Sequence, residues 1–344
     1  MKELVDWFLF HRRNFPWRKN PTPYQVWVSE VMLQQTQASR VIDFYERWME
    51  RFPTVKALAT ASIEEVLKCW EGLGYYSRAR LLHSASREIM QRFGGTIPHD
   101  PESLRSIKGL GPYTVGAILA FGFHKKAVAV DGNVMRVLAR LFEIADDISK
   151  AKSQSLFRQK ALDLLPDKEP HIFSEALIEL GAVVCRPKPN CHHCPLQQMC
   201  QSYQNGTQRN YPVKSQKVCY ELLHREVAVI YCQDKILLRQ GKEGIACSGL
   251  FEFPYFSCQE GGMSHEHARK EIESQLGLRV SFTEDLGTER QSFTRFRVTL
   301  YPKLYHCHKI RGIADHHWYN QEEIDTLTFS SGHKRILTRL KKSI

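Results

Sequence analysis

The chain has 344 residues, of which 42% are hydrophobic, so it is long enough for two folded domains that each bury a core. It contains no stretch of about 18 uncharged apolar residues, and its first residues lack the basic, apolar and small-residue order of an export signal, which excludes a membrane span and favours the cytoplasm. The net charge of +11 favours a polyanionic partner, because lysines and arginines that neutralise phosphates release counterions; a basic surface without a partner is an equal alternative.

Residues 1–204 carry apolar residues at three- and four-residue spacing, which predicts a helical domain. A helix start is recognisable at Thr22, which can cap the helix together with Gln25, and Pro23 suits the first turn. The periodicity predicts that this helix continues without interruption through residues 24–48. Further helices are expected at residues 61–73, 77–93 and 132–142.

A polar and basic stretch at residues 205–220 has no apolar periodicity and is interpreted as a linker. The pattern then changes: residues 225–240 indicate two short strands about a Gln-Asp turn, residues 296–310 a further strand, and residues 265–278 a helix. The sequence therefore predicts an all-helical first domain, followed by a smaller mixed α+β domain over residues 221–344.

Four cysteines lie close together at the end of the helical half, in the run CRPKPNCHHCPLQQMC. Four thiolates on one loop can bind a single soft metal centre, either an iron–sulfur cluster or a zinc ion. A pair of disulfides is disfavoured, because no export signal would take the chain to an oxidising compartment. The candidate ligands are Cys185, Cys191, Cys194 and Cys200.

The run KGLG at residues 108–111 lies between two helical segments. Gly109 and Gly111 allow a sharp turn, so backbone N–H groups and the positive end of the following helix can cradle an anion. In a basic chain we favour a DNA phosphate over a plain helix connection. Such a contact fixes position and reads no base sequence.

Two carboxyl groups stand in contrasting surroundings. Glu30 interrupts an apolar stripe that includes Val26 and Leu33; if buried, it has a raised pKa and donates a proton near neutral pH, whereas at the edge of the stripe it is an ordinary boundary residue. Asp131 precedes a helix, where it is either simply the N-cap or, as an ionised carboxylate, also faces a cation that develops in a substrate. One protonated and one ionised carboxyl group are what the cleavage of a glycosidic bond needs.

Two further groups are open to a structural and a functional interpretation. The amides of residues 34–37 can be solvated or can probe base edges, and Tyr75 and Tyr76 can pack in a core or wedge between bases. For both groups the sequence alone favours the structural alternative.

The motifs WVSEVMLQQTQ, GLGYYSRAR, KGLGPYTVGAI and VDGNVMRVLAR precede the four-cysteine loop, and in this order they resemble the adenine DNA glycosylase family (MutY). The resemblance is dense over residues 7–200 and looser beyond. It implies the two-lobed helix-hairpin-helix glycosylase fold and, as partner, double-stranded DNA in which adenine is opposite 8-oxoguanine or guanine. The implied enzyme, expected to be a monomer, flips the adenine out of the stack and hydrolyses its bond to deoxyribose, which leaves an abasic site.

The resemblance also implies roles for individual residues. Glu30 would protonate the leaving adenine at N7, and Asp131 would stabilise the oxocarbenium-like sugar. Tyr113 stands where the related endonuclease III enzymes have a lysine that attacks the sugar; a phenol cannot form that Schiff base, so we expect no strand cleavage. The other implied contacts are Asn133 in the active site, Trp17 and Arg18 in the adenine pocket, Gln35 and Tyr75 beside 8-oxoguanine and in the base stack, and Gly109 and Gly111 on a phosphate.

By the same resemblance the four cysteines bind a [4Fe–4S] cluster, with zinc as the alternative. Five residues separate Cys185 from Cys191, one fewer than is usual in the family. Two rival functions remain. A bifunctional endonuclease III-like enzyme acting on oxidised pyrimidines is disfavoured by Tyr113 and by the second domain, and a non-catalytic DNA-binding protein is disfavoured by the presence of both Glu30 and Asp131.

The second domain resembles the MutT-like (Nudix-like) module of the family through the runs GLFEFP and SFTRF. Ser274 and Gln275 stand where the MutT diphosphatase helix carries metal-binding glutamates, so we expect no nucleotide hydrolysis. Phe293, Thr294 and Arg295 correspond to the family's Phe-Ser-His contact to 8-oxoguanine. The fixed charge of Arg295 favours a phosphate contact over a base contact.

Overall fold

The computed structural model describes residues 1–215, 219–242, 248–293 and 295–343. The chain divides into two compact units, which are considered separately. Unit 1 comprises residues 1–61 and 77–217, and unit 2 comprises residues 62–76 and 218–344. Among the described residues, no helix combines the length and the apolar character needed to cross a membrane.

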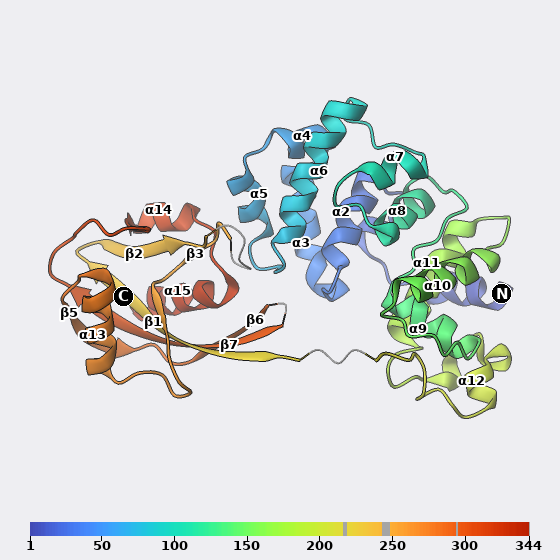
Figure 1. Ribbon diagram of the computed structural model, residues 1–344. Helices are drawn as coiled ribbons and strands as arrows, with labels where there is room; N and C mark the ends of the chain where they lie inside the picture. The colour runs from blue at the N-terminus through green and yellow to red at the C-terminus, as the bar shows by residue number, and fades with distance from the viewer. Residues whose placement is uncertain (216–218, 243–247, 294, 344) are drawn as a thin grey trace. The chain divides into compact units, whose positions relative to one another are not determined.

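Unit 1 is built from helices, in agreement with the predicted fold class (Figure 1). Its helices are α1 (Lys2–His11), η1 (Pro16–Arg18), α2 (Pro23–Leu33), α3 (Ala38–Arg51), α4 (Val55–Thr60), α6 (Ser77–Phe93), α7 (Pro101–Ser106), α8 (Pro112–Ala117), the π-helical turn η2 (Ile118–Gly122), α9 (Gly132–Leu141), α10 (Ala151–Asp163), α11 (Pro170–Val183), η3 (Cys191–His193), η4 (Gln197–Met199) and α12 (Gln201–Gln204).

The start of α2 follows from its first residues. The Thr22 hydroxyl accepts a hydrogen bond from the Gln25 backbone N–H, and the Gln25 side chain accepts one from the Thr22 N–H, which satisfies two donors that the helix leaves unpaired. The prediction of one helix through residues 24–48 is wrong, because α2 ends at Leu33 and α3 begins at Ala38.

The break between α2 and α3 is held by a residue from another helix. Arg78 of α6 is buried, and its Nη1 donates to the carbonyl oxygens of Val31, Met32 and Gln34 at 3.0, 2.9 and 2.5 Å. The guanidinium thus satisfies backbone acceptors that a continuing helix would otherwise bond itself. Gln35 then takes a left-handed conformation with φ +56°.

Two clusters of buried apolar side chains pack around the segment of unit 1 that contains Asp131. One cluster joins α1, α9, α10 and α11, and the other joins α2 with α8 and η2. Val128 and Val134 belong to the first cluster and Ala129 to the second. A Cβ on Gly116 would lie 2.0 Å from the Val128 carbonyl oxygen, so only glycine allows this close approach. The segment that carries Asp131 is therefore fixed on both sides.

Unit 2 is a mixed sheet with helices, together with α5 from the first half of the chain. The sheet order is β3-β2-β1-β7-β5, with β4 on β1, β6 on β7 and β8 on β2. The elements are α5 (Ile63–Trp70), β1 (Glu221–Cys232), β2 (Lys235–Gln240), β3 (Phe251–Glu252), β4 (Tyr255–Ser257), α13 (His265–Leu276), β5 (Val280–Asp285), β6 (Glu289–Phe293), β7 (Phe296–Cys307), β8 (His316–Asn320), α14 (Gln321–Thr326) and α15 (Ser331–Ser343).

Both faces of this sheet are buried, as the apolar character of β1 requires. Val227 and Val229 lie in a core with α14 and α15, whereas Ala228 and Ile230 lie in a core with α13. Successive side chains of a strand point to opposite faces, so helices cover each side of the sheet. The strands and the helix predicted for the second half are confirmed, including the Gln-Asp turn between β1 and β2.

Candidate active site

A cavity of about 1050 Å³ opens in unit 1. It is lined by side chains from η1, α2, the α2–α3 break, α8, the start of α9 and α11. Seven of the site residues named from the sequence of the helical half contribute to its wall. These are Trp17, Arg18, Glu30, Gln35, Tyr113, Asp131 and Asn133.

Glu30 is a buried carboxyl group on this wall, with 8% of its surface exposed. Burial raises its pKa to about 7, because the charged form loses water, and the nearby Glu175 and Asp131 carboxyl groups act in the same direction. The Tyr113 hydroxyl donates to Glu30 Oε2 at 2.5 Å and lowers the pKa in part. Glu30 can therefore hold a proton at neutral pH and release it in the cavity.

Tyr113 lies beside Glu30 as a donor. Burial raises the pKa of its phenol well above the ordinary value, and the neighbouring carboxyl groups add to the effect. The hydroxyl therefore stays protonated throughout the physiological range and can donate to only one oxygen of Glu30. The other oxygen, Oε1, receives no hydrogen bond from Tyr113 and can carry the Glu30 proton.

Asp131 is the N-cap of α9, and this capping role does not remove it from the cavity. Its Oδ1 accepts from the backbone N–H groups of Asn133 and Val134 at 2.9 and 2.8 Å, and its Oδ2 accepts from the Asn133 side-chain amide at 2.6 Å. Burial raises the pKa of Asp131, while these three hydrogen bonds oppose the rise because they favour the charged form.

Asn133 is held in one orientation from both ends of its amide. Its Nδ2 donates to Asp131, and its Oδ1 accepts from Arg136 Nη2 at 2.8 Å. The same Arg136 nitrogen donates to the Gly181 carbonyl oxygen at 2.8 Å, and a Cβ on Gly181 would lie 2.7 Å from the Asn133 Cβ. The close packing of α11 on α9 thus fixes the Asp131 carboxylate.

Arg18 and Trp17 form another part of the wall. Charged residues that were not expected from the sequence, Arg13 and Glu179, lie beside them. Arg18 Nη2 donates to Glu179 Oε2 at 2.8 Å, and Arg13 Nε donates to Glu179 Oε1 at 2.6 Å. Trp17 is buried edge-to-face against Tyr45. Glu175 and Glu179 are one turn apart on α11, a helix of mostly apolar residues, and their spacing is a sequence signal that predicts two carboxyl groups on one face.

Gln35 reaches the cavity because of the break between α2 and α3. It is exposed, and the whole of residues 34–37 lines the wall. The left-handed φ of +56° turns the chain at Gln35, and Arg78 holds the carbonyl groups on its N-terminal side. These amides therefore face the cavity rather than the surface of a continuous helix.

Residues 107–111, the loop that joins α7 to α8, do not contribute to the cavity wall. Gly109 has φ +99°, a conformation that favours glycine, and Gly111 is the N-cap of α8. Gly111 is exposed at this turn. The turn has the local form predicted from the sequence, two short helices joined by a glycine loop.

The four cysteines gather beside Arg140, which is buried. Arg140 Nη1 lies 3.4 Å from Cys185 Sγ and donates to the Arg186 carbonyl oxygen at 2.7 Å. Burial raises the pKa values of the Cys191, Cys194 and Cys200 thiols, and the charges of the other cysteines add to the effect. Within the described ranges, no three His, Cys, Asp or Glu side chains have the arrangement of a metal site.

The remaining site residues named from the sequence lie in unit 2. Tyr75 is 42% exposed and has φ +49°. Phe293 ends β6, and its ring lies 5.6 Å from that of Phe296, while Arg295 pairs with Glu221 at 3.7 Å. Thr294 lies outside the described residues. Ser274 and Gln275 are on α13, as expected.

Comparison with known proteins finds a family model that matches part of each half. Residues 28–161 match the family described as HhH-GPD superfamily base excision DNA repair protein, and residues 226–339 match the NUDIX domain family. A structure of a thermostable thymine-DNA glycosylase is 26% identical, with a TM-score of 0.55, and the match covers 59% of this chain and 94% of that one.

Curated relatives extend the similarity. An adenine DNA glycosylase of Rattus norvegicus is 44% identical over 59% of this chain and 41% of its own length, so the match spans less than half of that protein. An adenine DNA glycosylase of Buchnera aphidicola subsp. Schizaphis graminum is 31% identical over 74% of each chain. With that share of a relative covered at this identity, the chain belongs to the adenine DNA glycosylase family.

Proposed function

We propose that this protein removes adenine that is mispaired with 8-oxoguanine or guanine in double-stranded DNA, by hydrolysing its N-glycosidic bond. The observation that carries this proposal is the shared cavity of Glu30 and Asp131, in which the pKa of Glu30 is raised to about 7. One carboxyl group that holds a proton and one that accepts three N–H donors are the pair that cleavage of a glycosidic bond requires.

The first step is proton transfer to the leaving base. A flipped adenine in the cavity would receive the Glu30 proton at N7, which neutralises the charge that the departing purine develops. Tyr113 donates to Glu30 Oε2 and so orients the carboxyl group. As the proton leaves, the same hydrogen bond stabilises the carboxylate that remains.

The second step is stabilisation of the sugar. Loss of adenine leaves an oxocarbenium-like ring, and the Asp131 carboxylate would face that positive charge until water adds to it. Asn133 and Arg136 keep the carboxylate in place through two successive hydrogen bonds, so little reorganisation is needed as charge develops. Electrostatic help of this kind is worth on the order of 10²–10³ in rate.

Phosphate and base contacts outside the cavity complete the proposal. Gly109 and Gly111 would bind a backbone phosphate at the hairpin, while Gln35 and Tyr75 would contact the opposite base and the stack. In unit 2, Phe293 and Arg295 would contribute to recognition of the 8-oxoguanine strand. The chain-wide charge of +11 supports association with DNA.

A glycosylase assay on duplexes that differ only opposite the adenine tests this function. We expect adenine release opposite 8-oxoguanine and guanine, with strand breaks only after alkali, because Tyr113 offers no amine for a Schiff base. Glu30→Gln and Asp131→Asn should each lose activity about 100-fold or more. The matched changes Glu102→Gln and Asp167→Asn, at exposed positions of unit 1, should leave it unchanged. Full activity of Asp131→Asn, or borohydride trapping of the wild type, contradicts the proposal.

The four cysteines are proposed to hold a [4Fe–4S] cluster. Their chemistry fits such a group, since neighbouring cysteines help to raise the pKa values of the Cys194 and Cys200 thiols, and a buried arginine lies 3.4 Å from the Cys185 sulfur, where it can offset negative charge. When bound, the cluster would cross-link the loop of η3 and η4 to the end of α11. We expect purified protein to contain four iron atoms per chain and no zinc, and Cys194→Ser to lower both the iron content and the thermal midpoint. Stoichiometric zinc in metal analysis would favour the alternative.

A further inference from the structure

Unit 2 contains a short extended segment, residues 327–330, which joins β3 through one isolated β-bridge and is called the 327–330 strand below. Residues 327–330 run parallel to β3: the Phe251 N–H donates to the Thr328 carbonyl oxygen at 2.8 Å, and the Ser330 N–H donates to the Phe251 carbonyl oxygen at 3.3 Å. Because backbone groups alternate along a strand, those of Leu327 and Phe329 point away from β3. Unpaired backbone groups at such an edge need other partners.

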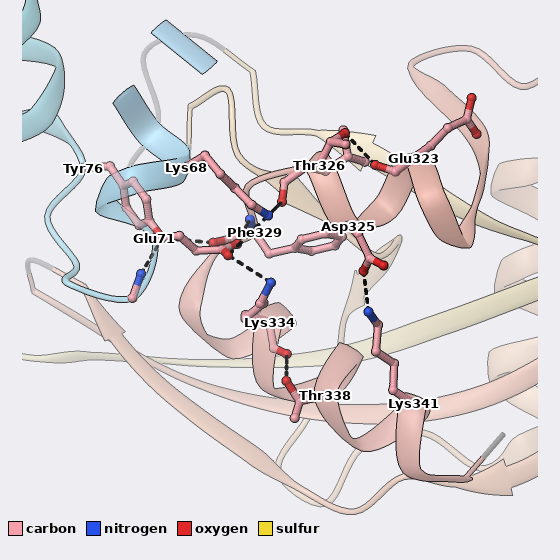
Figure 2. A network of polar contacts seen from close by, with 12 residues as sticks. Lys68, Glu71, Tyr76, Glu323, Asp325, Thr326, Phe329, Lys334, Thr338 and Lys341 are labelled. Atoms are coloured by element: carbon pink, nitrogen blue, oxygen red, sulfur yellow. Dashed lines mark hydrogen bonds and ion pairs between the residues drawn. The ribbon is translucent and has the colours of Figure 1, made fainter. Parts of the chain in front are cut away.

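These partners come from residues 62–76, the segment that joins α4 to α6 along the chain (Figure 2). Lys68 Nζ donates to the Leu327 carbonyl oxygen at 2.7 Å. The Phe329 N–H donates to Glu71 Oε1 at 2.8 Å, and the Tyr76 hydroxyl donates to the Phe329 carbonyl oxygen at 3.1 Å. Three successive outward groups of the strand are thus bonded by one segment.

An ion pair reinforces the contact. Lys334 Nζ lies 2.9 Å from Glu71 Oε2, while Oε1 accepts from the strand. The Glu71 side chain is only 12% exposed, and Lys68 is a second cation at 3.5 Å from Oε2. The Phe329 side chain is fully buried in the core with α15, which anchors the strand. A mostly buried carboxylate with two cations and a backbone donor is a directional contact rather than a loose surface pair.

The same segment carries Tyr75 in a loop of unusual backbone conformation. Gly72, Gly74 and Tyr75 have φ of +103°, +81° and +49°. The loop is closed by Trp70 Nε1, which donates to the Gly74 carbonyl oxygen at 2.9 Å, and by the Gly72 N–H, which donates to the Tyr76 hydroxyl at 3.3 Å. The Tyr76 hydroxyl therefore joins the loop to the Phe329 strand, and the exposed ring of Tyr75 is its direct neighbour.

We propose that Glu71, Tyr76 and Lys334 are positioning residues, through which the edge strand 327–330 fixes the Tyr75 loop for insertion between DNA bases. This inference rests on the proposed function, in which Tyr75 contacts the base stack. A left-handed tyrosine costs conformational energy and persists only where its surroundings hold it. A loop fixed before DNA arrives loses less entropy when its aromatic ring enters the stack.

Two pairs of matched variants test the inference. Tyr76→Phe removes the hydroxyl that bonds Phe329, and Tyr301→Phe removes another phenol of unit 2, which bonds His224 and Gly261. Lys334→Met breaks the pair with Glu71, and Lys341→Met breaks the pair of the same helix with Asp325 (Figure 2). In the full chain, Tyr76→Phe and Lys334→Met should raise amide hydrogen exchange in residues 70–76, and the two controls should not.

Binding to a duplex whose adenosine carries a 2′-fluorine, which blocks cleavage, gives the functional readout. We expect Tyr76→Phe and Lys334→Met to weaken binding about fivefold, and Tyr75→Ala about tenfold. Tyr76→Phe should weaken binding no further when Tyr75 is already alanine, because it acts through that ring. Independent, additive losses, or equal effects of Lys334→Met and Lys341→Met, overturn the inference.

Adenine release by the wild type separates this inference from the proposed function. If the wild type releases adenine while the variants show additive losses, the positioning role alone is wrong. If no mispair yields adenine, the proposed function is wrong. Amide hydrogen exchange in residues 70–76 still decides whether the 327–330 strand holds the loop.

Discussion

At the scale of single residues, opposing effects on Glu30 decide its chemistry. Burial raises the pKa of Glu30 and the Tyr113 hydrogen bond lowers it, with a value of about 7 as the result. The sequence could show that a carboxyl group interrupts an apolar stripe, but the stripe alone left burial and a boundary position equally open. Tyr113 and Glu175, which approach from α8 and α11, decide between them, and such partners are not visible from local spacing.

We expect the Tyr113 hydroxyl to influence the upper pH limit of activity, because it donates a hydrogen bond to Glu30, the proposed acid. In Tyr113→Phe the hydrogen bond that stabilises the Glu30 carboxylate is lost, so the pKa of Glu30 should rise above about 7. Because Glu30 is proposed to act in its protonated form, the alkaline limb of the single-turnover rate should move to higher pH, although the maximal rate falls. Rates measured from about pH 5 to pH 10 check this prediction. A limb that stays in place or moves to lower pH contradicts it.

Glu30 should also cost the protein stability above neutral pH. Its folded-state pKa of about 7 lies above the ordinary 4.5, so the unfolded chain releases the proton first and stability falls as the pH rises between these values. Glu30→Gln removes this loss, which is on the order of 3 kcal/mol for a pKa that rises from 4.5 to about 7. Thermal midpoints should coincide near pH 4 and separate by pH 8, with the variant more stable. Glu102→Gln, an exposed change, should show no such separation.

At the scale of elements, the predicted helices agree with the structure where residues within or next to the helix determine its bounds. Ser77–Phe93 and Ile63–Trp70 lie within the predicted ranges, because the apolar faces of both helices and the Ser62 cap of the second are local. Residues 24–48 differ, since their periodicity continues across the break. The cause is Arg78, more than 40 residues away along the chain, and no local pattern reports such a contact.

Arg78 is therefore expected to control both stability and the Gln35 loop. Arg78→Met leaves three backbone carbonyl groups without their charged donor, which should lower the free energy of unfolding by about 3 kcal/mol. With the turn released, Gln35 would lose its fixed place, so discrimination between 8-oxoguanine and thymine opposite adenine should fall. Denaturant unfolding and single-turnover rates on the two duplexes measure these effects. Arg87→Met, an exposed change on the same helix, is the control.

At the scale of the whole molecule, the motifs predicted many residues of the cavity wall but not how the fold brings them together. Glu30, Tyr113 and Asp131 lie in three separate motifs, and only the fold brings them to one wall. The association of residues 62–76 with the second half was beyond sequence patterns as well, because its polar contacts are made to backbone groups of residues 327–329. Backbone partners leave no trace in the residue types of a strand.

Net charge is a property of the whole chain, but its use in DNA binding depends on position. Arg295→Ala and Arg279→Ala lower the charge equally, and each arginine is exposed and paired with a glutamate of unit 2. If Arg295 contacts a phosphate, its loss should reduce the slope of log Kd against log salt by about 0.9, whereas Arg279→Ala should leave the slope unchanged. Titrations at several salt concentrations measure both slopes. Equal slopes for the two variants would mean that Arg295 acts only through the total charge and touches no phosphate.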